Sequence, residues 1–143
     1  MVRLGHVERL SVADVPDLRR RASRDLAEVI VARAALLMPE DRRLLEAIYT
    51  DGLTALAVAQ LTGDSPRSVR RRIRTLAARV LSDRFVFVMR QREHWRPTRR
   101  RVATACIVQG RPMREGARHL RLSLHVVRRQ LDAVNALFEA QSR

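Results

Sequence analysis

The sequence is poor in several residue types that other protein classes need. It has no lysine and a single cysteine, Cys106, which cannot form an internal disulfide and suits a reducing compartment. Aromatic residues make up only 3% of the 143 residues, and glycine and proline occur five times each. With so few turn-forming residues a β-sandwich or barrel is disfavoured, and we expect an aliphatic core built from helices.

Sequence features of enzymes, metalloproteins and membrane proteins are also missing. There is no glycine-rich phosphate loop, no metal-ligand spacing and no nucleophile with a suitable base, and His6, His94 and His119 are scattered. No stretch approaches the roughly 20 apolar residues of a membrane span, and the first residues do not resemble a signal peptide. We therefore expect a cytoplasmic protein without catalytic activity, cofactor, metal or membrane partner.

What the sequence has in excess is positive charge in a helix-forming composition. Arginine supplies all 29 basic residues against 15 acidic ones, for a formal net charge of +14. Leu, Ala, Arg and Glu dominate, and these residues favour helix. Such a charge excess usually neutralises a polyanion and releases its counterions. The composition therefore predicts an all-α protein that binds double-stranded DNA; a membrane surface would call for a basic amphipathic helix with bulky apolar residues.

The sequence contains an internal repeat, in which the segment 39–80 aligns with the segment 97–138 without a gap. The aligned identities include proline, glycine, serine and valine, which biased composition does not explain: Pro39/Pro97, Gly52/Gly110, Ala59/Ala117, Ser65/Ser123 and Val69/Val127. Each repeat predicts three helices, because helix starts, caps and stops separate apolar stripes of helical spacing. The expected helices are 39–52, 54–61 and 65–81 in the first repeat, then 98–109, 113–120 and 123–140 in the second.

The second and third helices of each repeat have the spacing of a helix-turn-helix motif. Ala59 is small enough for the third helix to cross over it, Gly63 permits a left-handed turn, and Val69 anchors the third helix to the core. The second repeat has Arg121 in place of the turn glycine. Because a side chain in a left-handed turn has a steric cost, we expect the second turn to be built differently.

On a helical wheel, the third helix of the first repeat has an apolar face and a basic face. Its apolar stripe is Val69, Ile73, Leu76 and Val80. Its basic face is Arg67, Arg71 and Arg74, with Arg70 beside them. Arginines near the N-terminal end of such a helix can hold guanine O6 and N7 in the major groove, while others hold phosphate. This pattern predicts a DNA-reading helix.

The third helix of the second repeat is less basic at the corresponding positions. Its apolar stripe is Val127, Leu131, Val134 and Phe138. Its exposed positions are His125, Arg128, Arg129 and Asp132. Asp132 stands where the first repeat has Arg74, so the second unit either reads a different DNA sequence or binds DNA more weakly.

Segments outside the repeats complete the expected organisation. Residues 14–37 predict a long helix whose apolar stripe either packs on the first unit or forms a homodimer interface. Phe85–Met89 is too apolar for a free linker and either extends the preceding helix or forms a short strand. Arg96–Arg101 is the densest basic run, so Arg99 and Arg100 are candidate contacts to the DNA backbone or minor groove. The expected organisation is an N-terminal helix in 1–38, repeat units in 39–81 and 97–143, and a connecting segment in 82–96.

Motif residues of both repeats resemble a known family. Those of the first are Met38–Leu45, Gly52-Leu53-Thr54, Gly63 and the run Ser65-Pro66-Arg67-Ser68-Val69-Arg70-Arg71-Arg72-Ile73. They resemble the C-terminal promoter-reading domain of bacterial sigma factors. The second repeat, with Gly110 and Ser123–Leu131, is similar to the same domain or to the related LuxR-type output domain.

The resemblance implies promoter DNA and RNA polymerase as partners. The DNA-contacting residues that it implies are Arg67, Ser68, Arg70, Arg71 and Arg74. The segment 1–38, which precedes the first unit, is too short for the promoter-melting domain of a complete sigma factor. We therefore predict a sigma-factor-like transcription regulator of the bacterial nucleoid. Two alternatives stay open: the DNA-recognition part of a transposase or recombinase system, and an RNA polymerase-interacting module with non-specific DNA affinity.

Overall fold

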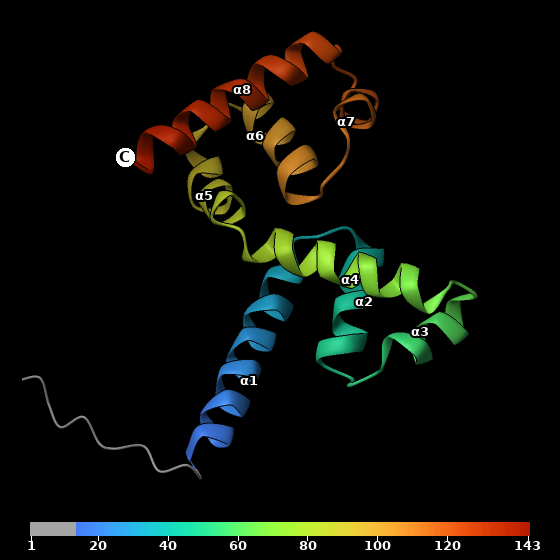
Figure 1. The fold of residues 1–143 in the computed structure, drawn as a ribbon. Coiled ribbons are helices and arrows are strands. Elements are labelled where there is room, and N and C mark those ends of the chain that lie inside the picture. Colours follow the sequence, from blue (N-terminus) through green and yellow to red (C-terminus); the bar gives the residue numbers. More distant parts are fainter. Residues whose placement is uncertain (1–13) are drawn as a thin grey trace, which may run out of the picture.

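The computed structural model describes residues 14–143, with side chains from residue 21 onward. All regular structure in this part of the chain is helical, which confirms the expected all-α class (Figure 1). The expected N-terminal segment 1–38 contains α1 (Asp14–Ala34), and its residues 1–13 lie outside the described part. The first unit comprises α2 (Pro39–Tyr49), α3 (Ala55–Thr62) and α4 (Pro66–Leu81). The rest of the chain forms α5 (Asp83–Gln91), the 3-10 turn η1 (Arg92–His94), α6 (Pro97–Ala103), the π-helical turn η2 (Thr104–Val108), α7 (Met113–Leu120) and α8 (Leu124–Gln141).

The register of the sequence repeat recurs in the helices and in their caps. The offset that aligns Pro39 with Pro97 also aligns both ends of α3 with those of α7, and the start of α4 with the start of α8. Ser65 Oγ accepts the Ser68 N–H at 3.1 Å, and Ser123 Oγ accepts the Val126 N–H at 3.2 Å. These equivalent N-caps start the third helix of each unit at the same register, because each satisfies an amide that lacks a helical partner.

The turn before the third helix has the same left-handed form in both units. Gly63 has φ +79°, and Arg121 has φ +56° and ψ +42°. The expectation of a differently built second turn is therefore wrong. Arg121 adopts the costly conformation because its N–H is bonded to the end of α7 and the Leu122 N–H donates to the Ala117 carbonyl at 2.9 Å.

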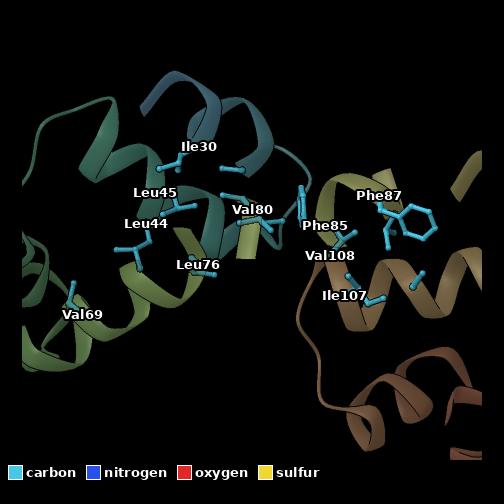
Figure 2. Close-up of a cluster of buried hydrophobic side chains, with 14 of the residues drawn as sticks. Ile30, Leu44, Leu45, Val69, Leu76, Val80, Phe85, Phe87, Ile107 and Val108 are labelled. Atoms are coloured by element: carbon cyan, nitrogen blue, oxygen red, sulfur yellow. The ribbon is translucent and has the colours of Figure 1, made fainter. Parts of the chain in front are cut away.

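The segment 82–96 is a structural helix rather than a connection. Ser82 has an extended backbone (φ −70°, ψ 144°) that ends α4, and its Oγ accepts the Phe85 N–H at 3.2 Å to start α5. Both expectations for Phe85–Met89, an extension of α4 and a strand, are therefore wrong. Phe85 is 1% exposed and Val88 is fully buried. Figure 2 shows Phe85 between Val80 of the first unit and Val108 of the second, so one core runs through both units.

Aromatic packing and an arginine strengthen the connection between the units. Phe87 lies 5.8 Å from Trp95 and 5.4 Å from Phe138, measured between ring centroids. Arg79, on α4, donates from Nη1 to the Gln109 carbonyl of the second unit at 3.1 Å. The Arg79 guanidinium occupies the space beside Gly110 that a Cβ there would fill. Together these contacts fix how the second unit is oriented on the first.

Replacement of Phe85 by alanine tests whether the units share one core. The Phe85→Ala variant is expected to lose about 3–5 kcal/mol of unfolding free energy, because a large cavity opens between the units. Urea denaturation followed by Trp95 fluorescence and by far-ultraviolet circular dichroism should give one coincident transition in the wild type. Leu61→Ala, at a side chain 77% exposed, is the control and should change stability by less than about 0.5 kcal/mol. Two separate transitions in the wild type would contradict a shared core.

A second prediction isolates the Arg79 contact by comparing two equivalent glycines. Gly52 and Gly110 have φ values of +71° and +70°, so alanine at either position carries a similar backbone cost of about 1–2 kcal/mol. Gly110→Ala should cost about 1 kcal/mol more, because its Cβ displaces Arg79 from the Gln109 carbonyl, whereas nothing lies near the Cβ position of Gly52. Thermal unfolding measures the difference, which should vanish when Arg79→Ala is also present. Equal costs in the wild-type background would mean that the contact adds no stability.

Candidate nucleic-acid interface

α4 presents the expected basic face at its N-terminal end. Val69, Leu76 and Val80 are 5%, 2% and 0% exposed, and Ile73 is half-buried. The candidate DNA-contacting residues on the other side are all exposed: Arg67, Ser68, Arg70, Arg71 and Arg74. Within the described part of the chain, none of these four arginines forms an ion pair with an acidic side chain. Their guanidinium groups are thus available to an external anion.

Arg72 belongs to the same basic run but has a structural partner. Its Nη2 lies 2.8 Å from Asp41 Oδ1 and 3.9 Å from Glu40 Oε2, both in the first turn of α2. The Asp41 side chain is only 16% exposed. This ion pair fixes α4 across α2, and the basic face is therefore made by its neighbours Arg70 and Arg71.

α8 repeats the arrangement with a different charge pattern. Val127 and Val134 are fully buried. Leu131 and Phe138 are half-buried beside them. The exposed positions of the opposite face are His125, Arg128, Arg129 and Asp132. The face is thus positioned like that of α4 but has one carboxylate among its positive charges.

The basic run 96–101 does not form an extended arm. Its residues from Pro97 onward are the start of α6, so insertion of an extended segment into a minor groove is not supported. Arg99 Nε donates to Gln130 Oε1 on α8 at 3.1 Å, and Arg100 Nη1 lies 3.7 Å from Glu93 Oε2. Both predicted contact residues are half-buried and have partners inside the protein.

A groove of about 340 Å³ in the second unit gathers cationic side chains that the sequence did not single out. The basic residues lining it are Arg92, Arg100, Arg101 and His119, against one carboxylate, Glu93. It lies between η1, α6 and α7, so residues that are far apart in the sequence meet there. No local pattern signals this groove, because only the packing of α7 beside α6 brings His119 to the arginines.

The first unit has an apolar groove between the same elements. It measures about 490 Å³, and its apolar lining is Leu44, Ala47, Leu53, Val58, Leu61 and Val69. Leu61 at its edge is 77% exposed. Leu61 and His119 are equivalent in the sequence repeat, so the two units differ in the chemistry of this groove.

The one cysteine lies in the second unit's smaller apolar cluster. Cys106 is half-buried, packs beside Val102, Ala117 and Val127, and its Sγ lies where a Cβ on Gly116 would sit. Burial raises the pKa of its thiol, and the nearby Arg111 charge lowers it by less. In residues 14–143 no three His, Cys, Asp or Glu side chains are grouped as metal ligands. The expected core position of Cys106 thus agrees with its packing.

Comparison with known proteins identifies no relative. No protein-family model, curated protein or solved structure matches this chain. The sigma-factor resemblance therefore stays a prediction that rests on the motif residues alone. No helix in the described part of the chain is long and apolar enough to cross a lipid bilayer.

The salt dependence of binding to a duplex of arbitrary sequence tests the basic face of α4. Each phosphate contact contributes about 0.9 to the slope of log K against log salt concentration. Arg71→Ala should therefore reduce the slope by about one contact. Arg72→Ala is the matched control and should leave the slope unchanged, because Arg72 faces Asp41. Equal reductions for both variants would mean that binding depends on net charge and not on this face.

Proposed function

We propose that the protein is a sequence-specific double-stranded DNA-binding transcription regulator of the sigma-factor-like type. In this proposal α3–α4 and α7–α8 are two helix-turn-helix motifs, and α4 enters the major groove with its N-terminal half. The observation that carries the proposal is the exposed, unpaired arginine face of α4 directly after a left-handed turn. Arg67, Arg70 and Arg71 lie within the first turns of that helix, where a recognition helix contacts base edges.

The charge distribution supports DNA as the ligand. Four arginines on one helical face supply guanidinium groups for guanine edges and for phosphates. The groove of Arg92, Arg101 and His119 adds positive charge in the second unit, and it suits a sugar-phosphate backbone better than base edges. The net charge of +14 favours fast association with DNA and strong salt dependence.

The connection between the units supports a two-part binding site. Because α5 and Arg79 fix the relative orientation of the units, α4 and α8 would reach DNA at a constant separation. Asp132 on α8 would repel phosphate and can accept a hydrogen bond from cytosine N4. The two halves of the DNA site would therefore differ in sequence.

A second candidate is an RNA polymerase-interacting module with only non-specific DNA affinity. The apolar groove of the first unit favours it, since Leu61 and Leu53 are 77% and 37% exposed at its edge. A helix of the polymerase could bury these leucines. The same DNA-selection experiment separates this candidate from the first.

Selection of bound duplexes from a random library at physiological salt tests the proposal. We expect one enriched motif with two unlike parts at a fixed separation. Binding without enrichment, weakening smoothly as salt rises, would contradict sequence-specific reading and favour the polymerase-interacting module.

Single arginine replacements then assign roles on the selected site. Arg71→Ala should weaken binding to that site by about 1–3 kcal/mol and relax the preference at one base pair, because a bidentate contact to a base is lost. Fluorescence anisotropy on the selected site and on its single-base variants measures both effects. Arg129→Ala tests the second unit in the same way. An equal loss on every sequence would identify a phosphate contact instead of base reading.

A further inference from the structure

α1 is covered by the rest of the protein along only part of its length. Its C-terminal part packs through Ile30 and Ala34, which are 1% and 0% exposed. In residues 21–29 every side chain except Ala27 is exposed. Figure 1 shows this part of α1 extending away from the other helices. A helix of this length is marginal in water without packing, so the exposed part of α1 calls for a second surface.

The exposed part of α1 has the apolar spacing of a helix-pairing surface. Ala22, Leu26 and Val29 follow one another at intervals of four and three residues and therefore share one face. Leu26 is 48% exposed and Val29 is 37% exposed, although both are large apolar side chains. This face points away from Ile30 and Ala34, which pack on the body of the protein, so a neighbour could cover it without disturbing the fold.

The order of charges beside this face indicates which neighbour fits. Arg21 precedes Asp25 and Glu28, so positive charge lies N-terminal and negative charge C-terminal on one flank of the helix. In an antiparallel pair of identical helices, Arg21 lies across from Asp25 and Glu28 of the partner subunit, and the contact occurs twice. A parallel pair would place equal charges side by side. The helix is thus complementary to its own reversed copy, as a two-fold interface requires.

We propose that a second copy of this chain pairs antiparallel along the exposed part of α1, with Ala22, Leu26 and Val29 at the centre of the contact. The dimer carries two copies of the α4 and α8 faces, related by a two-fold axis. If the proposed function holds, its DNA target is an inverted repeat of the two-part site. The pairing itself does not depend on DNA binding.

Sedimentation velocity of the full chain without DNA tests the pairing. We expect the wild type to sediment at twice its chain mass of 16.4 kDa at micromolar concentration. Leu26→Glu should lower the association constant by at least about 100-fold, because it removes two apolar side chains and places two charges in the contact. Leu56→Glu, at a leucine of α3 that is 50% exposed, is the matched control and should remain dimeric. Circular dichroism of both variants establishes that they are folded.

The orientation is tested by charge exchange and by cross-linking. Arg21→Glu and Glu28→Arg should each weaken the dimer, and the two together should restore it. In a Cys106→Ser background, Asp25→Cys should cross-link to its own copy with a short bismaleimide, whereas Ala32→Cys should not. Cross-linking at both positions would overturn the antiparallel arrangement in favour of a parallel one.

The two proposals fail in different experiments. A wild type that is monomeric at all concentrations, or a Leu26→Glu variant that stays dimeric, would overturn the pairing even if DNA selection enriched a motif. A dimer with the expected variant behaviour, together with DNA selection that enriches nothing, would support the pairing and contradict the proposed function.

Discussion

Burial of α5 between the two units is the constraint on which the rest of the structure depends. Phe85 and Val88 have apolar neighbours in both units, so neither unit has a complete core without them. Core contacts are not directional, and on their own they would tolerate some rotation of one unit on the other. The hydrogen bond from Arg79 to the Gln109 carbonyl is directional, and Gly110 leaves room for it. On the proposed function, these contacts set the separation of the two DNA-reading helices and hence the geometry of the DNA site.

The helices of the repeat could be predicted from the sequence because their boundaries are determined locally. Ser65 and Ser123 each cap a helix through an amide three residues away, and the bounds expected from them agree with the structure to within a few residues. α5 could not be predicted in the same way. Phe85–Met89 is continuously apolar and has no helical period, since its side chains are covered from several sides. Ser82 both ends α4 and starts α5 without a glycine or proline to signal the break.

The candidate site was predicted to the extent that it depends on one helix. The wheel of α4 separates Arg71 from Val69, and the structure places them on opposite faces. The partners of Arg72 and Arg99 lie on other helices, each 31 residues away in the chain, and no periodicity indicates such pairs. Arg99 therefore looked like a member of a free basic run, although its guanidinium is bonded to Gln130. The groove around His119 was missed for the same reason.

The repeat keeps its internal positions and changes its surface, and this difference bears on function. Val69 and Val127 occupy equivalent buried positions, and the serine caps before them are identical. On the surface, Arg74 is replaced by Asp132 and Leu61 by His119. If both units only supplied non-specific positive charge, a carboxylate on the exposed face of α8 would weaken binding at no gain. A carboxylate is useful there if α8 discriminates between bases, because it accepts a hydrogen bond from cytosine and repels phosphate that is wrongly placed. The acidic residue on α8 therefore favours sequence reading by the second unit over a purely electrostatic role.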